Sequence, residues 1–188
     1  MALTASLRQR EHERDLIEAA QANPVAFGVL YEQHVDAIYA YALHRVRDGA
    51  AAEDVVSETF HRALEHLDRY EWRGVPFSAW LYRIASNVIA ARYRHEPTAP
   101  LEEAAYLRDE GIGPEQSLLL GERTGELMSA VAALPPEQQQ ALILRYGQDL
   151  RNKDIAYIMG RSEGAVKQLL HRAIGGLQRR LAASGDEG

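Results

Sequence analysis

The 188-residue chain contains no cysteine, which excludes disulfide bonds and thiolate metal ligands. It also has no uninterrupted apolar run long enough to cross a membrane as a helix. The segment from Met1 to Arg14 is polar and charged and lacks the apolar centre of a signal peptide. We therefore expect a cytoplasmic protein that folds around ordinary hydrophobic cores and does not insert into a membrane.

Sequence signals of enzymatic chemistry are also scarce. The seven histidines show no metal-ligand spacing, and His61 and His66 are five residues apart, so they do not share a helix face well. The chain has no glycine-rich phosphate loop, nucleophile elbow or clustered pair of carboxylates. We expect no catalytic residues, no metal site, no cofactor and no enzymatic activity.

Apolar side chains recur every three or four residues through most of the chain, and sustained two-residue alternation is missing. This pattern predicts an all-α fold. Helices are expected at residues 11–21, from Pro24 onward behind an Asn23 cap, at about 51–67 and at about 77–94. Both Tyr31 and Leu64 fall on stripes that should be buried.

Residues 96–117 divide the helical pattern into two parts. They include three prolines, two glycines, six acidic residues and one arginine, a composition that resists packing. We therefore expect two helical domains, residues 11–95 and 118–182, joined by a flexible acidic linker. Residues 1–10 and 183–188 are expected to be disordered tails.

The most informative segment, residues 152–172, has the pattern of a helix-turn-helix. Gly160 can adopt the left-handed conformation that ends the first helix, and Ser162 can cap the second. The second helix would bury Val166 and Leu170. A helix-turn-helix places its second helix in the DNA major groove. An ordinary helical hairpin with a solvated charged face is the alternative.

The charge is unevenly distributed for a chain with a net charge of −6. Residues 134–181 contain eight Lys or Arg and four Asp or Glu, so this segment carries +4 and the rest −10. A basic C-terminal module suits local contact with phosphates. The acidic remainder should weaken indiscriminate DNA binding.

The expected helix from Phe77 carries a second signal of nucleic-acid binding. Trp80, Arg83 and Asn87 share one face, and the helix ends in Arg92 and Arg94. Aromatic rings stack on exposed bases, with about 1–3 kcal/mol per base. The alternative is that Trp80 belongs to the hydrophobic core.

Three segments, residues 52–64, 72–87 and 134–146, together with the helix-turn-helix, resemble the extracytoplasmic-function sigma factors of bacterial RNA polymerase. The resemblance covers most of residues 24–181. It implies an alternative sigma factor that binds core polymerase, recognises the −10 and −35 promoter elements and promotes transcription initiation. Such a factor would be a monomer when free, and an anti-sigma factor is a further partner that the family suggests.

The resemblance also implies roles for individual residues. The surface that docks on the clamp helices of the polymerase's largest subunit would contain Asp54, Glu58 and Arg62. The polymerase flap is a second expected contact. The single-stranded −10 element would be bound by Trp72, Arg73, Gly74, Trp80, Arg83 and Asn87. The duplex −35 element would be bound by Arg161, Ser162, Glu163, Lys167, Gln168, His171 and Arg172.

Two features depart from the family pattern. Arg151 stands where the first helix of the motif usually has a capping Ser or Thr. The missing cap should lower the stability of this helix by about 1 kcal/mol, unless Asp149 or Asn152 provides a cap instead. Gly175 and Gly176 each destabilise a helix by about 1 kcal/mol, so the sequence leaves open whether the last helix continues past them or ends or frays there.

Two other functions are compatible with the sequence. A helix-turn-helix regulator would bind duplex DNA as a homodimer without sigma activity, and it predicts a palindromic site. An interaction module would use the same surfaces to bind only a regulatory protein. A sigma factor predicts instead two unlike promoter elements at a fixed spacing.

Overall fold

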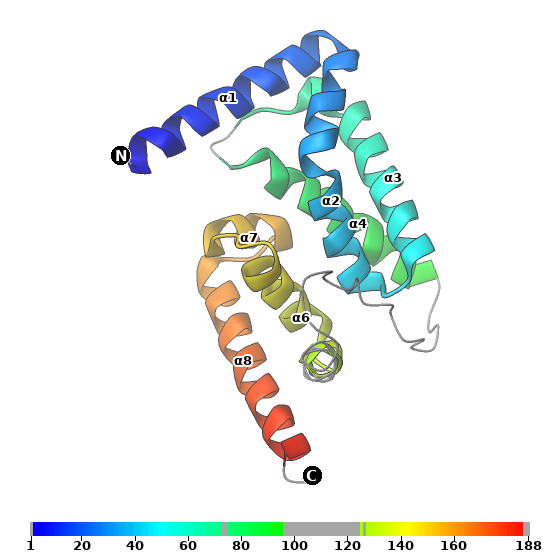
Figure 1. The fold of residues 1–188 in the computed structure, drawn as a ribbon, viewed down its shortest axis with the longest axis vertical. Coiled ribbons are helices and arrows are strands. Elements are labelled where there is room, and N and C mark those ends of the chain that lie inside the picture. Colours follow the sequence, from blue (N-terminus) through cyan, green and yellow to red (C-terminus); the bar gives the residue numbers. More distant parts are fainter. Residues whose placement is uncertain (1, 73–74, 96–124, 126, 186–188) are drawn as a thin grey trace, which may run out of the picture.

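The computed structural model describes residues 2–72, 75–95, 125 and 127–185. Every regular element in these ranges is helical, as the sequence predicts. Figure 1 shows two groups of helices, α1 to α4 in the upper part and α6 to α8 in the lower part. The predicted linker, residues 96–117, lies outside the described residues, as do Arg73 and Gly74.

Local caps set the starts of the first helices. Helix α1 spans Ala2–Ala22 and begins well before the predicted Glu11. The Asn23 side chain then accepts a hydrogen bond from the Val25 N–H at 3.1 Å, which starts the short turn η1 (Pro24–Ala26) and leads into α2 (Phe27–Val46). Helix α3 (Gly49–Glu65) starts in the same way, because Asp48 Oδ1 accepts from the Ala51 N–H at 2.6 Å.

The core of the first group forms where α2, α3 and α4 (Phe77–His95) meet, with the turn η2 (Leu67–Arg69) between α3 and α4. Its fully buried side chains include Leu30, Ile38, Tyr41, Val55, Phe77 and Leu81. Tyr31 and Leu64 were predicted to be buried, and this was wrong. They are 41% and 42% exposed, because they lie at the edges of their stripes and neighbouring helices cover them only in part.

The second group consists of helical residues 127–132, α6 (Pro136–Leu142), a π-helical turn η3 (Ile143–Gly147), α7 (Asn152–Met159) and α8 (Glu163–Gly185). Residues 130–134 pack against α8 in a separate small core with Ala173 and Leu177. None of the described helices is long and apolar enough to span a bilayer.

The sequence did not decide whether the last helix continues past Gly175 and Gly176, and in the structure α8 continues to Gly185. A Cβ atom on Gly176 would lie only 3.0 Å from Leu134 Cδ2. The missing side chain therefore allows Leu134 to pack closely against α8, and this contact offsets the poor helix propensity of glycine. Beyond the glycines, the Arg180 guanidinium donates to the Ala133 carbonyl at 3.0 Å.

The two groups of helices contact each other directly, chiefly through α4 and α7. The Tyr82 hydroxyl on α4 donates to Gln148 Oε1 at 2.6 Å. Gln140 Nε2 on α6 donates to Ser86 Oγ at 2.9 Å. The Arg47 guanidinium, just after α2, donates to the Met128 carbonyl at 2.8 Å. The two predicted domains are thus packed together in this structure.

Candidate functional site

The first candidate surface is the outward face of α3, where Asp54, Glu58 and Arg62 follow one another at four-residue spacing. Glu58 Oε1 accepts a hydrogen bond from Arg62 Nε at 2.6 Å. Their side chains are 44% and 43% exposed, and that of Asp54 is 68% exposed. Ion pairs this exposed contribute little to stability, so these groups can exchange their partners for those of another macromolecule at small cost.

The structure adds a residue of α4 to this surface. Arg92 NH1 lies 3.2 Å from Asp54 Oδ2, although the sequence suggested that Arg92 belongs to the basic end of a nucleic-acid-binding helix. A shallow hollow lies between α3 and α4, lined by Asp54, Ser57, Glu58, Val88 and Arg92. Asp54 and Arg92 are 38 residues apart, so no local spacing could have predicted their contact.

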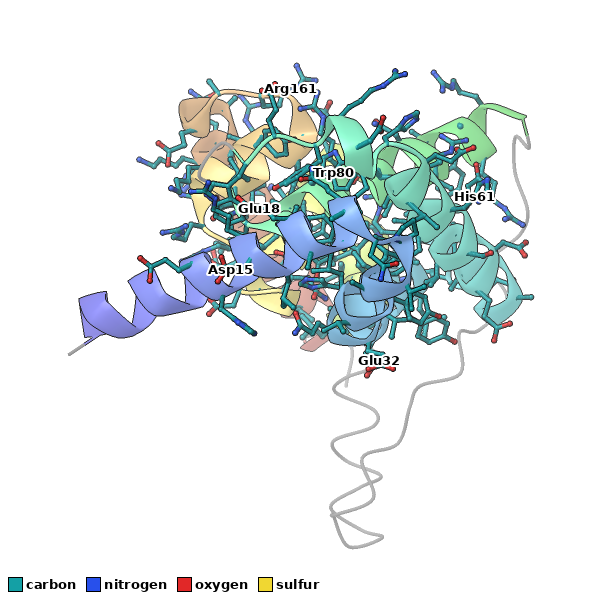
Figure 2. The ribbon with its side chains drawn as sticks, turned by 90° about the horizontal axis from the view of Figure 1, so that it is seen from above. Asp15, Glu18, Glu32, His61, Trp80 and Arg161 are labelled. Atoms are coloured by element: carbon teal, nitrogen blue, oxygen red, sulfur yellow. The ribbon has the colours of Figure 1, made fainter. Side chains whose placement is uncertain are left out.

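The second candidate surface is the face of α4 that carries Trp80, Arg83 and Asn87. Trp80 is half-buried, with its ring centroid 4.7 Å from that of Tyr70 and 5.4 Å from that of Phe77. Trp80, which is labelled in Figure 2, packs against the hydrophobic core and is only partly buried. Trp80 therefore belongs to an aromatic cluster and still keeps part of its ring accessible. Trp72 is also exposed only in part.

This face of α4 is shared with the second group of helices. The Arg83 guanidinium lies over the Tyr157 ring, 4.9 Å from its centroid, in a cation–π contact. Asn87, one turn further along α4, is exposed. Arg83 is exposed as well, so α7 contacts this face at Arg83 and leaves both Arg83 and Asn87 accessible to solvent, whereas Trp80 is half-buried.

Burial raises the pKa values of two tyrosine hydroxyls near the contact between Arg83 and Tyr157. It raises the pKa of Tyr82, and the neighbouring Tyr41 adds to the shift. It also raises the pKa of Tyr70, with further contributions from Glu13 and Tyr157. Both hydroxyls therefore stay protonated at neutral pH, which makes Tyr82 the donor in its hydrogen bond to Gln148.

The third candidate surface belongs to the helix-turn-helix formed by α7 and α8. Gly160 ends α7 in the left-handed region with φ = 62°, as predicted. The Ser162 hydroxyl accepts a hydrogen bond from the Ala165 N–H at 3.2 Å, which confirms the predicted cap of α8. Arg161, also in the turn, forms an ion pair with Glu137 on α6.

The polar face of α8 is open to solvent in the structure. Glu163, Lys167, Gln168, His171 and Arg172 are all exposed, whereas Val166 and Leu170 on the opposite side are buried. This division is the one that the sequence predicts. The exposed side chains offer donors and acceptors at the spacing that a helix needs in a major groove.

Helix α7 begins without a side-chain cap at Arg151, and neither Asp149 nor Asn152 provides one. The Arg151 guanidinium instead donates to Asp154 Oδ2 at 3.1 Å. Asp154 is buried, with 2% of its surface exposed. In the sequence Asp154 is one acidic residue among several, and nothing in its spacing separates a buried aspartate from an exposed one.

The described residues contain no group of three or more His, Asp or Glu side chains that could hold a metal ion. The polar groups on α3, α4 and α8 are instead distributed over extended helix faces. Such faces suit recognition of large partners, because they offer many weak contacts and no enclosed reaction chamber.

Comparison with protein families defines the class. Residues 30–97 match the Sigma-70 region 2 model, and residues 124–175 match the Sigma-70 region 4 model. The first match contains α3 and α4, and the second contains the helix-turn-helix. The chain therefore combines a Sigma-70 region 2 with a Sigma-70 region 4, the two regions of an RNA polymerase sigma factor.

Similar proteins define the class more narrowly. BldN of Streptomyces coelicolor, an ECF RNA polymerase sigma factor, is 40% identical over 173 residues, which cover 89% of this chain and 65% of BldN. SigL of Mycobacterium tuberculosis, also an ECF RNA polymerase sigma factor, is 32% identical over 89% of this chain and 95% of SigL. The chain belongs to the extracytoplasmic-function sigma factors of RNA polymerase.

Solved structures agree with this assignment. CnrH, solved in complex with the cytosolic domain of CnrY, has a TM-score of 0.69 at 26% identity, covering 91% of this chain and 97% of CnrH. The sigma factor RpoE of Bartonella quintana, solved with the anti-sigma factor NepR, has a TM-score of 0.67 at 23% identity, covering 83% and 96% of the two chains. At that identity, the RpoE match shows the fold alone.

Proposed function

We propose that the chain acts as an alternative sigma factor, which binds core RNA polymerase, recognises −10 and −35 promoter elements and promotes transcription initiation. It carries out no covalent chemistry of its own. The observation that carries this proposal is the order of the two matches, region 2 before region 4, on a chain whose α8 keeps its polar face exposed. A homodimeric helix-turn-helix regulator would not need the region 2 helices.

The acidic face of α3 is the proposed docking surface for the clamp helices of the polymerase's largest subunit. Asp54, Glu58 and Arg62 hold exposed ion pairs that a basic partner can replace. The hollow beside Asp54 offers an apolar wall at Val88 as well as charge. The second group of helices would contact the polymerase flap.

The α4 face is the proposed site for the single-stranded −10 element. Trp72 and Trp80 would stack on bases, Arg83 would contact phosphate, and Asn87 would bind a base edge. Arg73 and Gly74 belong to the same proposed site and lie outside the described residues. Because Arg83 contacts Tyr157 here, we propose that α7 moves away from α4 when a DNA strand occupies the whole face.

The α8 face is the proposed site for the duplex −35 element. Lys167, Gln168, His171 and Arg172 would contact bases or phosphates, and the turn would add Arg161 and Ser162 with Glu163. The Arg161–Glu137 ion pair is partly exposed, so the guanidinium can turn to phosphate at small cost. The face needs no rearrangement to meet a major groove.

We place the protein in the cytoplasm, where its polymerase partner works, as a monomer when free. CnrH and RpoE were solved with CnrY and NepR. By analogy we propose a protein regulator for this chain, which would compete with polymerase for the α3 face. The interaction-module alternative predicts such a regulator and no polymerase binding.

In vitro transcription tests the proposal. Purified protein and core polymerase should initiate at a subset of promoters in a library of native promoters, and the selected promoters should share two unlike elements at fixed spacing. A palindromic site bound by a stable dimer would favour the homodimeric regulator. Lack of initiation at every promoter, with core bound or not, would reject sigma activity.

A further inference from the structure

Helix α1 precedes the segment that matches region 2, yet it is attached to the part of the molecule proposed to bind the −10 strand. Its residues Ile17 and Ala20 are 3% and 2% exposed, so this half of the helix is an integral part of the core. Two polar side chains on either side of this apolar contact, Glu13 and Gln21, reach residues more than forty positions away.

Gln21 holds the beginning of the segment between α3 and α4. Its Nε2 group donates to the Leu67 carbonyl at 2.9 Å and to the Tyr70 carbonyl at 2.8 Å. The two hydrogens of one amide group are thus used on the two ends of the turn η2. Asparagine is the other uncharged side chain with an amide group that offers two donors, but it is shorter.

Glu13 holds the end of the same segment. Its Oε1 accepts a hydrogen bond from the N–H of Phe77, the first residue of α4, at 3.0 Å. The N–H groups of a first helical turn have no partner within the helix, and a carboxylate there is also favoured by the helix dipole. Glu13 therefore caps α4 from another helix.

Glu13 and Gln21 are separated by eight residues, or about 12 Å along a helix. They hold Tyr70 and Phe77, and Trp72 lies between these two residues in the sequence. Tyr70 and Phe77, the residues that they hold, are in edge contact with each other at 5.4 Å, and both contact Trp80. The position of the Trp80 ring therefore depends on both anchors.

We propose that Glu13 and Gln21 are positioning residues of the −10 site, which hold Tyr70, Phe77 and the aromatic cluster in the arrangement that receives a single DNA strand. This inference rests on the proposed sigma function for its consequence at DNA, but the anchoring itself does not. A strand-separated base is held better by a preorganised pocket than by one that must order on binding. Neither residue touches the DNA in this scheme.

The chain contains only two tryptophans, Trp72 and Trp80, and both lie in the anchored region. Their fluorescence in the free full-length chain therefore reports on the anchors directly. In Glu13→Ala and in Gln21→Leu, quenching by acrylamide should rise about twofold, because the segment opens locally more often. Unchanged quenching in both variants would overturn the proposal.

The second measurement is the affinity of the holoenzyme for a single-stranded −10 oligonucleotide, taken from a promoter that the wild-type holoenzyme selects. Each variant should lose about fivefold in affinity, the effect of one typical hydrogen bond. Affinity for core polymerase and for −35 duplex should stay within about twofold. Loss of all three affinities together would reveal general unfolding and overturn the positioning role, as would unchanged −10 affinity.

Two further variants separate anchoring from charge and from folding. Glu13→Gln keeps an acceptor for the Phe77 N–H and should restore most of the −10 affinity. Glu18→Ala removes an exposed carboxylate of the same helix, which pairs only locally with Arg14, and should change neither measurement. A Glu18→Ala effect as large as that of Glu13→Ala would overturn the proposal. If the wild-type holoenzyme bound no promoter strand, the proposed sigma function would be rejected. The acrylamide quenching measurement would then still test whether Glu13 and Gln21 anchor the aromatic cluster.

Discussion

The two proposed DNA-binding faces of this molecule differ in how far they are exposed to solvent. The α8 face is exposed along its whole length, with its apolar side packed into the second group of helices. The α4 face is less open, because Trp80 is half-buried in an aromatic cluster and Arg83, although exposed, is in contact with Tyr157 of α7. A face that binds duplex DNA through polar side chains can remain exposed to solvent in the free protein. A face that stacks on bases carries apolar rings, so it is more stable when another part of the protein covers these rings until a DNA strand binds.

The most direct test of this difference is to keep the second group of helices, which includes α7, joined to α4. Cysteines at Ser86 and Gln140, whose side chains are hydrogen-bonded at 2.9 Å, can be joined by a short bis-maleimide in a chain without native cysteine. Promoter opening should fall by about a hundredfold or more, because the competent state is no longer populated. Permanganate reactivity of unpaired thymines measures this.

In the same locked protein, −35 duplex binding should be retained, since α8 is already exposed. The double-cysteine chain treated with a monofunctional maleimide is the control and should open promoters nearly as well as the wild type. A locked protein that opens promoters at the normal rate would show that α4 needs no uncovering.

Substitutions on α8 test the open face. Lys167→Ala or Arg172→Ala should weaken −35 duplex binding by about 1–3 kcal/mol, or roughly 5- to 150-fold, for a direct base contact. A phosphate contact would give a smaller loss and a shallower salt dependence. Fluorescence anisotropy with duplex DNA at several salt concentrations distinguishes the two. Unchanged affinity would remove these residues from the proposed site.

Asn87 tests the exposed part of α4. Asn87→Ala should lower the fraction of open promoter about fivefold, through loss of about 1 kcal/mol of hydrogen bonding to the strand. Binding of closed duplex should change little, because that depends on α8. Equal losses in closed binding and in opening would contradict a role specific to the separated strand.

The contact between α7 and α4 can be weakened by a substitution that keeps a large side chain on α7. Tyr157→Leu removes the aromatic face under Arg83, a contact of about 0.5–1 kcal/mol at an exposed site, so the free chain should bind a −10 strand about two- to fivefold more tightly. Tyr146→Leu, which changes a tyrosine that is 63% exposed, is the matched control. In the holoenzyme, where we propose that α7 is already displaced, this gain in affinity for the −10 strand should vanish.

The smallest expected effect concerns the packing that keeps α8 in place. Gly175→Ala should stabilise the chain by about 0.5–1 kcal/mol, since the new Cβ meets only the tip of Arg179 at 3.6 Å. Gly176→Ala should give no gain or a loss, because its Cβ would lie 3.0 Å from Leu134. Urea denaturation measures the difference. Equal stabilisation by both would contradict the close-packing explanation.

The features that the sequence predicted correctly are those that neighbouring residues determine. Asn23 and Ser162 form caps within two or three residues of themselves, and Gly160 needs only its own backbone to end α7. The exposed face of α8 follows from helical spacing alone. The resemblance to a family then assigned meaning to these faces.

The features that the sequence did not predict are those in which distant residues meet. Periodicity places Leu64 on a stripe but does not say where the covering helix stops. It shows Asp154 as a charge but not the packing that buries it. The contact of Arg83 with Tyr157 and that of Arg92 with Asp54 join segments far apart in the chain, and no local pattern carries such information.

The hydrogen bonds between the two groups of helices have one further consequence. The bonds from Tyr82 to Gln148, from Gln140 to Ser86 and from Arg47 to Met128 all lie in partly exposed positions. When the groups separate, water can hydrate each freed donor and acceptor, so no orphaned polar atom is left behind. The apolar part of the joint behaves differently, because one hydrophobic core continues from α2, α3 and α4 into α6, α7 and α8. Separation of the groups would expose part of this core, so the binding of polymerase and DNA has to offset that cost.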